Sequence, residues 1–117
     1  MSLVILKEQR ELKLAEGIVA RVVTGDSMTV AHVKLAEGAV LAEHSHENEQ
    51  IVNVMEGELE LTVEDQKHIL VPGKVLILPP NIPHSGRAIT DVYVVDTFHP
   101  VREDFRDPNF KGYGKGD

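Results

Sequence analysis

Residues 38–57 read GAVLAEHSHENEQIVNVMEG and contain the most informative pattern of the chain. His44 and His46 are two positions apart, so in an extended strand their imidazoles point to the same face. Gln50 follows in the same stretch, and His84 comes later, after an Ile-Pro pair. Donors that arrive from a neighbouring strand and turn can complete the coordination of one ion. We therefore predict a metal site formed by His44, His46, Gln50 and His84.

The composition argues against several classes of function. The chain has 117 residues, which suits one domain, and a formal net charge of −7. It lacks the cluster of Lys and Arg that phosphate binding needs, so nucleic acid is not an expected partner. It contains no apolar run of about 18 residues, no signal-like start and no Cys. We expect a cytoplasmic protein with neither a membrane span nor a disulfide.

The pattern along the chain is typical of an all-β protein. Short apolar runs with many β-branched residues are separated by Gly, Pro, Asn and Asp. Turns are predicted at Gly25-Asp26, Pro72-Gly73 and Asp65-Gln66, and their spacing indicates a sandwich or barrel. No long amphipathic helix is expected. The predicted strands are Ile18–Thr24, Met28–Leu35, Ile51–Glu56, Glu58–Glu64, Lys67–Val71, Lys74–Leu78 and Asp91–Phe98.

A single domain is predicted over residues 1–117. Its core is expected from about residue 18 to about residue 105. The segment 106–117 is polar and Gly-rich, and we expect it to pack loosely.

Two of the predicted strands are apolar on both faces. They are Val75–Leu78 and, apart from Asn53, Ile51–Met55. Both faces must then be covered. Either a second subunit covers the outer face, which predicts a homodimer, or the N-terminal segment Val4–Leu14 lies across it.

The glycines around the site belong to a wider pattern. Gly38 and Gly57 bracket the first stretch, and a second stretch runs from Gly73 to His84 as GKVLILPPNIPH. These spacings resemble the two signature motifs of the cupin superfamily, over roughly residues 35–88. The resemblance implies a cupin-type double-stranded β-helix, which is a jelly-roll barrel.

Three positions depart from the family pattern. Gln50 stands where the family usually has Glu, Asn81 replaces a turn Gly, and Ala88 replaces a trailing Asn. Asn81 is a mild change because Asn tolerates the left-handed region. With Gln50, four neutral ligands leave the full charge on a divalent ion, which strengthens it as a Lewis acid and attracts anionic substrates. Higher oxidation states favour anionic ligands, so oxygenase chemistry is less expected. The ion is predicted to be a divalent transition metal such as Zn, Ni, Fe or Mn.

Two further histidines lie outside this pattern. His32 alternates with Met28 and Val30 and could face the interior, so we interpret it as a pocket or core histidine. His68 is expected at the surface.

The last predicted strand carries an acidic residue on an apolar face. Val92, Val94, Asp96 and Phe98 share that face by the period of two. A carboxylate buried there without a partner is costly, so Asp96 either points into the barrel mouth for function or sits in water at the strand end. Arg102 follows at a distance that could bring it to the same mouth, where its planar fork suits carboxylate recognition.

These residues together resemble those of the pectin-degradation cupins, which convert 4,5-unsaturated monouronates, released by polysaccharide lyases, into linear keto forms. In that family three His and one Gln hold the metal, and catalytic roles are implied here for Asp96, Phe98 and Arg102. One departure is Glu47-Asn48, where those enzymes commonly have Pro-His. The resemblance is carried by His44-Ser45-His46, Glu49-Gln50, residues 54–60, Asp96-Thr97-Phe98 and residues 100–105.

The leading hypothesis is therefore a metal-dependent isomerase that opens the ring of a small anionic sugar acid. The metal polarises a substrate oxygen, Asp96 shuttles a proton, Phe98 forms an apolar wall and Arg102 holds the carboxylate. Two alternatives remain open. One is a metal-dependent oxygenase or another isomerase of the same fold, and the other is a non-catalytic module that binds a sugar or small acid.

Overall fold

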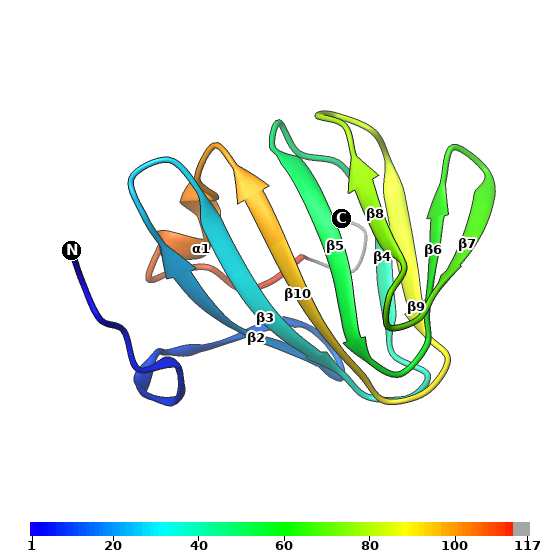
Figure 1. The fold of residues 1–117 in the computed structure, drawn as a ribbon, viewed down its shortest axis with the longest axis horizontal. Coiled ribbons are helices and arrows are strands. Elements are labelled where there is room, and N and C mark those ends of the chain that lie inside the picture. Colours follow the sequence, from blue (N-terminus) through cyan, green and yellow to red (C-terminus); the bar gives the residue numbers. More distant parts are fainter. Residues whose placement is uncertain (114–117) are drawn as a thin grey trace.

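The computed structural model describes residues 1–113, and most of its regular structure is β-strand (Figure 1). Two short helical segments flank the strands, namely the 3-10 turn η1 (Leu6–Glu8) and α1 (Glu103–Arg106). No helix in this part of the chain has the length and apolar character that a membrane crossing needs. In chain order the strands are β1 (Glu11–Ala15), β2 (Ile18–Thr24), β3 (Thr29–Leu35), β4 (Val40–His44), β5 (Glu49–Glu56), β6 (Leu59–Val63), β7 (Gln66–Leu70), β8 (Val75–Leu78), β9 (His84–Ala88) and β10 (Val92–His99).

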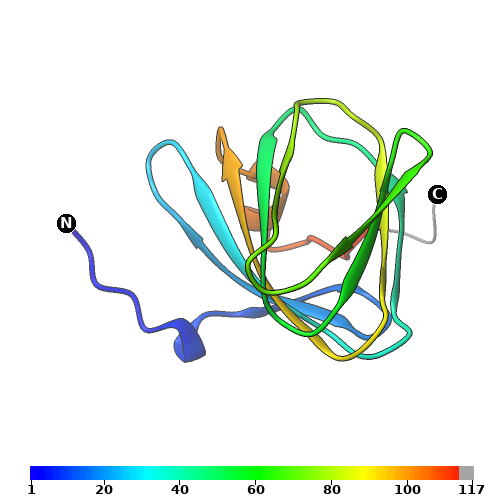
Figure 2. The same cartoon turned by 45° about the vertical axis from the view of Figure 1, so that its right-hand side comes forward.

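The strands form two antiparallel sheets that face each other as the walls of a barrel (Figure 2). The larger sheet has the order β1-β2-β3-β10-β5-β8, and the smaller has the order β4-β9-β6-β7. Alternate side chains point between the sheets, so Val52 and Val54 of β5 and Leu59 and Leu61 of β6 share one buried core. The prediction of an all-β jelly-roll barrel is confirmed.

Seven strands lie where the sequence predicts them, with ends that differ by at most two residues. Strands β1, β4 and β9 were not predicted. Strand β9 reads HSGRA and has no β-branched residue, and a Cβ on its Gly86 would lie 3.0 Å from Leu61 Cδ2. Because β4 and β9 carry site histidines, their composition follows the site rather than strand propensity.

The turns match the sequence prediction with one correction. Lys74 N–H donates to Val71 O at 2.9 Å across Pro72-Gly73, as in a type II turn. The hairpin between β6 and β7 turns at Glu64-Asp65, not at Asp65-Gln66, since both Glu64 and Asp65 have positive φ angles and Val63 pairs with Gln66. The shift by one residue makes a two-residue loop of the primed type that fits strand twist.

The outer face of β5 and β8 is exposed within a single copy of the chain. Val75 and Ile77 are 54% and 60% exposed. The proposal that Val4–Leu14 covers this face is wrong, because β1 pairs with β2 at the opposite edge of the sheet. Of the two predicted ways to cover the outer face of β5 and β8, only a second subunit remains compatible with the order of the strands.

The C-terminal segment returns to the barrel in the described part of the chain. A loosely packed tail was expected over residues 106–117. In the structure Phe105 is buried, Phe110 packs against the core, and Tyr113 N–H donates to Leu14 O at 2.9 Å. Residues 114–117 lie outside the described residues.

Candidate metal centre

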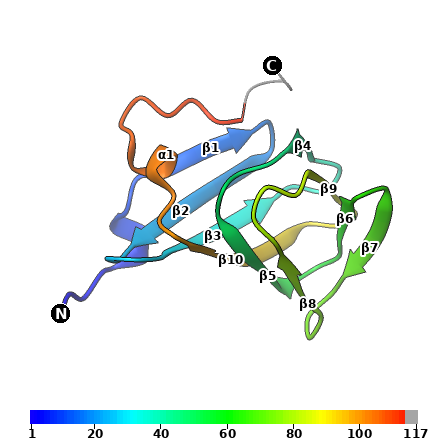
Figure 3. The ribbon, with the colours of Figure 1, turned by 90° about the horizontal axis from the view of Figure 1, so that it is seen from above.

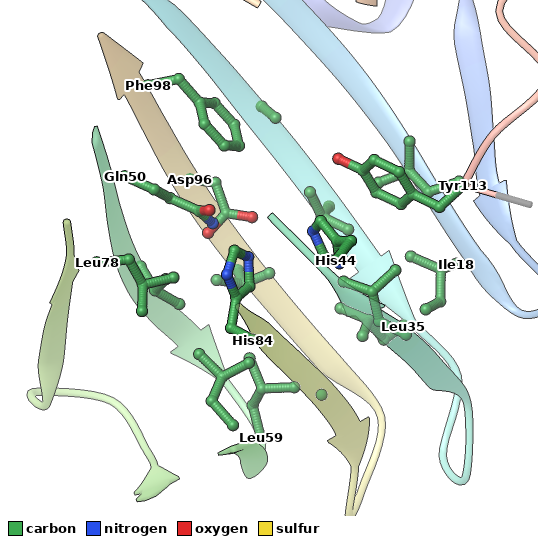
Figure 4. A pocket seen from close by; sticks show the side chains of 18 of the residues that line it. Ile18, Leu35, His44, Gln50, Leu59, Leu78, His84, Asp96, Phe98 and Tyr113 are labelled. Atoms are coloured by element: carbon green, nitrogen blue, oxygen red, sulfur yellow. The ribbon is translucent and has the colours of Figure 1, made fainter. Parts of the chain in front are cut away.

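Three histidines from two motifs meet at one end of the barrel. His44 ends β4, His46 lies in the loop to β5, and His84 begins β9 directly opposite His44 in the strand register. One ring nitrogen from each of the three lies within 4.8 Å of the others. Gln50 points to the same place from β5 in the other sheet (Figure 4). The structure thus brings together all four predicted metal ligands.

The orientation of each imidazole is fixed by the backbone carbonyl of a residue two positions away. Nδ1 of His44 lies 2.9 Å from Ala42 O, and Nδ1 of His84 lies 2.9 Å from Ile82 O. Nδ1 of His46 lies 3.1 Å from Asn48 O. Since a carbonyl only accepts, each Nδ1 carries the proton and donates it. Each Nε2 is then left with a free lone pair. Histidines that bind a metal usually have this arrangement, in which the other ring nitrogen donates to a carbonyl or carboxylate.

The contact between His46 and Gln50 supports a cation at this point. Nε2 of His46 lies 3.1 Å from Oε1 of Gln50. A neutral imidazole has one proton, and in His46 that proton already goes to Asn48 O. A cation between the two lone pairs, or a reversed Gln50 amide, would remove the conflict, and the convergence of two more imidazoles favours the cation. The donor set therefore fits a divalent transition ion.

The electrostatics keep the histidines neutral. Burial lowers the pKa of His44 and of His46 to about 4, and it also lowers the pKa of His84. The positive charge of Arg102 acts in the same direction on all three pKa values and contributes to these shifts. Neutral imidazoles are the form that binds a metal, so at neutral pH the cluster is ready without losing protons.

Asp96 points into the barrel. Its strand partners Ala31 and Val52 are core residues, and Asp96 lines a cavity together with His44 and His84. Its Oδ1 is fully buried and has no hydrogen-bond partner within residues 1–113. Burial raises the pKa of Asp96 to about 7, although the Gln50 amide and Arg102 oppose the rise. The alternative that Asp96 sits in water at the strand end is wrong.

Arg102 lies at the same end but is held more tightly than the sequence suggested. It is 3% exposed. Its Nε and Nη2 donate to Asp104 at 2.9 and 2.7 Å. Its guanidinium carbon lies 4.7 Å from the Phe98 ring centroid and 4.0 Å from that of Phe105. Only Nη1, which is buried, has no partner within residues 1–113.

Phe98 belongs to the buried core and also contacts the site. It is 3% exposed and meets the His46 ring edge-on, with centroids 5.5 Å apart. Below it, the cavity that Asp96 lines has a volume of about 50 Å³ and mainly aliphatic walls. That volume holds a few water molecules rather than a sugar ring.

Sequence reasoning missed two residues of this end. Asn48 is buried, and its Nδ2 donates to Pro100 O at 2.5 Å and Val101 O at 3.2 Å, which ties the ligand loop to the segment before Arg102. Tyr113 stacks on His44 with ring centroids 4.5 Å apart. Asn48 had a signal, because it lies between the site residues His46 and Gln50. Tyr113 had none, since it lies in the segment expected to be loose.

The two remaining histidines of interest lie away from the cluster. His32 is on the outer face of β3, where its Nδ1 and the hydroxyl of Tyr93 are 2.6 Å apart. The interpretation of His32 as a pocket or core histidine is wrong, because the inward positions of β3 are those of Thr29, Ala31 and Val33. His68 is half-buried on β7, in the strand at the edge of the smaller sheet.

The fold and the site together define a class of protein, namely a small β-barrel with a histidine cluster at one end. The family model described as a cupin domain matches residues 31–98, and the chain belongs to the cupin family. It is also similar to the pectin degradation protein KdgF of Dickeya dadantii, with 32% identity over 96 residues that cover 80% of this chain and 87% of that protein.

Solved structures agree with this assignment. The structure of KdgF from a Halomonas species matches with a TM-score of 0.82 and 30% identity, and the match covers 90% of this chain and 98% of that one. An RmlC-like cupin from Shewanella frigidimarina matches with the same TM-score of 0.82 at 24% identity, over 90% of this chain and 96% of that one. The second match supports the fold alone.

Proposed function

We propose that this protein is a metal-dependent enzyme that converts 4,5-unsaturated monouronates, or a closely related sugar acid, into linear keto forms. The observation that carries the proposal is a pair of unsatisfied atoms. Within residues 1–113, Asp96 Oδ1 and Arg102 Nη1 are the only buried side-chain nitrogen or oxygen atoms without a hydrogen-bond partner. Buried polar atoms normally have partners, so this pair supports the presence of bound water or of polar ligand groups at this end of the barrel.

A sugar acid has the chemistry to satisfy both atoms. Its carboxylate accepts hydrogen bonds, which matches the donor Nη1 of Arg102. Its hydroxyl groups donate, which matches the acceptor Oδ1 of Asp96. The similarity to the pectin degradation protein KdgF supports a uronate in particular, since pectin is a polymer of uronic acids.

The metal in this proposal is a divalent transition ion such as Zn, Ni, Fe or Mn, held by His44, His46, His84 and Gln50. When bound, it would supply Lewis-acid polarisation of a substrate oxygen. All four ligands are neutral, so the site would keep a net positive charge next to Arg102. Such a charge favours an anionic substrate over a neutral sugar.

The reaction needs one group that moves a proton. A proton leaves the anomeric hydroxyl, the ring carbon–oxygen bond breaks, and a proton is added to the alkene carbon, so the conversion is an isomerisation without a redox partner. Asp96 is the carboxyl group that lines the cavity beside the cluster, and we assign it both transfers. Phe98 forms the apolar wall that excludes water, and Arg102 orients the substrate carboxylate through Nη1.

The test is the loss of ultraviolet absorption from the conjugated alkene of an unsaturated galacturonate monomer. Wild-type protein with bound metal should remove the absorption, and Asp96→Asn should be slower by at least about 100-fold with its metal content unchanged. Asp26→Asn, in the exposed β2–β3 turn, is the matched control and should behave as wild type. Equal rates for Asp96→Asn and wild type would remove Asp96 from the mechanism. Thermal stabilisation by the uronate without turnover would instead favour the binding module.

We also propose that two copies pair through the outer face of β5 and β8. Ile51 and Ile77 lie opposite each other across these strands and are 39% and 60% exposed. A second copy is the favoured occupant because β8 is an unpaired edge strand and a patch on neighbouring strands can pair with itself about a two-fold axis. Light scattering should show a dimer that Ile77→Glu separates and that Val40→Glu, an equally exposed site on β4, leaves intact. A monomeric wild type at micromolar concentration would refute the pairing.

A further inference from the structure

The segment after α1 approaches the site along β1. Figure 3 shows it running beside that strand toward the barrel. Tyr113 N–H donates to Leu14 O at 2.9 Å. At Gly112, which has a φ of +88°, an added Cβ would lie 2.7 Å from Lys13 O and 2.8 Å from Leu14 O. Only glycine allows so close an approach of two backbones, so the contact requires this residue.

Tyr113 covers one face of a metal-ligand ring. Its ring and that of His44 have centroids 4.5 Å apart and planes inclined by 22° (Figure 4). The edge of the same imidazole is fixed by the contact between its Nδ1 and Ala42 O. The hydrogen bond to Ala42 O fixes the edge of the His44 ring, and the stacked Tyr113 ring fixes its plane. Together they determine the direction of the lone pair on His44 Nε2.

The hydroxyl of Tyr113 acts on a second residue of the site. Arg102 Nη2 donates to it at 2.8 Å, in addition to its bond to Asp104. A guanidinium has no acceptor, so the phenol oxygen is the acceptor in this bond. With Nε and Nη2 engaged and with Phe98 and Phe105 close to the guanidinium carbon, Nη1 is the part of Arg102 left for a ligand.

We propose that Tyr113 is a positioning residue that aligns His44 for the metal through its ring and aligns Arg102 for the substrate carboxylate through its hydroxyl. The first half of this inference rests on the metal site of the proposed function, and the second half rests on its substrate as well. The two halves separate by chemistry, because Phe at this position keeps the ring and loses the hydroxyl, whereas Ala loses both.

The experiment uses Co²⁺ as a spectroscopic probe and the variants Tyr113→Phe and Tyr113→Ala in the full chain. Loss of an outer partner of a metal ligand typically weakens metal binding 10–100-fold. We therefore expect Tyr113→Ala to bind Co²⁺ at least about tenfold more weakly and with shifted visible absorption bands. Tyr113→Phe should retain the wild-type affinity and bands. With the unsaturated uronate, Tyr113→Phe should raise KM several-fold more than it lowers kcat.

Gly112→Ala provides an independent variant that leaves the tyrosine in the sequence. It displaces the segment from β1, so it should reproduce the Co²⁺ phenotype of Tyr113→Ala. The matched control is Tyr93→Phe, on the outer face of β10, which should retain the wild-type Co²⁺ affinity, spectrum and kinetics. The chain has two Tyr and no Trp, so in Tyr93→Phe the tyrosine fluorescence reports Tyr113 alone. Binding of Co²⁺ should change that emission.

The outcomes separate this inference from the proposed function. If wild type takes up no Co²⁺, the metal site itself fails. If wild type binds Co²⁺ and Tyr113→Ala matches it in affinity and spectrum, the alignment of His44 by Tyr113 is refuted while the metal site stands. If Tyr113→Phe leaves KM unchanged in an active enzyme, the alignment of Arg102 is refuted.

Discussion

The side-chain oxygen of Gln50 lies 3.1 Å from Nε2 of His46, and both atoms are acceptors when Nδ1 of His46 donates to Asn48 O. These residues come from opposite walls of the barrel mouth, the loop after β4 and strand β5. An acceptor pair at this distance is unfavourable unless a cation lies between the two atoms or the Gln50 amide is reversed. This contact is the reason that we propose Gln50 as a fourth, uncharged ligand beside the three imidazoles.

Replacing Gln50 by Glu should strengthen metal binding and weaken catalysis. The added carboxylate cancels one unit of the ion's charge, so we expect Gln50→Glu to bind Zn²⁺ at least about tenfold more tightly, which is about 1.4 kcal/mol. A less positive centre is a poorer Lewis acid, so kcat should fall. Competition with a chromophoric chelator measures the affinity. Gln66→Glu, at the exposed start of β7, is the charge-matched control, and weaker binding by Gln50→Glu would contradict the assignment.

Removing one imidazole should abolish tight metal binding. His84→Ala leaves two histidines and one amide, and we expect the affinity for Zn²⁺ or Ni²⁺ to fall by at least about 100-fold, equivalent to about 2.7 kcal/mol. His32→Ala changes a histidine on the outer face and should bind as wild type. Calorimetric titration of metal-free protein measures both. Equal affinities for the two variants would place the metal elsewhere.

Two glycines with the same backbone conformation should respond differently to alanine. Gly57 and Gly38 have φ angles of +88° and +85°. A Cβ on Gly57 would overlap the Asp91 carbonyl oxygen, whereas one on Gly38 meets nothing within 4 Å. We expect Gly38→Ala to cost about 1 kcal/mol from φ alone and Gly57→Ala to cost about 3 kcal/mol. Urea unfolding measures the free energy of unfolding of both variants. Equal decreases for Gly38→Ala and Gly57→Ala would show that the backbone around Gly57 relaxes freely.

The buried amide of Asn48 should stabilise the barrel mouth. Asn48→Ala removes two donated hydrogen bonds and leaves the carbonyls of Pro100 and Val101 without that partner. The free energy of unfolding should fall by about 1–3 kcal/mol. Asn109→Ala, at an exposed position, should change it by less than about 0.5 kcal/mol. Thermal unfolding of the metal-free proteins tests the difference, and a neutral Asn48→Ala would assign the loop's position to other contacts.

Acidification should destabilise the metal-free protein. His44 and His46 have an ordinary pKa of 6.5, which burial lowers to about 4 in the folded chain. Between these values the unfolded chain binds more protons, so stability falls as pH falls from about 6.5 to about 4. Asp96 acts in the opposite direction, because its pKa rises from 3.8 to about 7 and the folded chain keeps a proton that the unfolded chain loses. Asp96→Asn should therefore lose stability more steeply than wild type over this range. Urea unfolding with a chelator at several pH values measures both slopes, and parallel slopes would contradict the shifted pKa of Asp96.

The sequence predicted the convergence of the histidines because the signal for it is local. His44, His46 and Gln50 lie within seven positions, and the glycines around them fix the turns that bring in His84. The period of two in β10 placed Asp96 on the same face as Val92, Val94 and Phe98, but it left open whether the side chain enters the barrel or sits in water at the strand end. By contrast, His32 was assigned to the wrong face of its strand. Its apolar neighbours Met28 and Val30 suggested an inward face, but they themselves lie outside the core.

Contacts between distant segments could not be predicted in this way. The bonds from Asn48 to Pro100 and Val101 join residues more than 50 positions apart. The stacking of Tyr113 on His44 depends on the path of the segment after α1, which a polar and Gly-rich composition does not reveal. Strand β9 was missed because three of its five residues, Ser85, Gly86 and Ala88, are small.

The ligand set that we propose draws on both walls of the barrel, with His44 and His84 on the smaller sheet and Gln50 on the larger one. An ion held there would cross-link the two sheets, because separating them would require breaking coordination bonds as well as exposing the hydrophobic core. Metal starvation would then loosen the mouth and expose it to proteases. The lifetime of the protein in a cell, and not only its chemistry, would follow the supply of the metal.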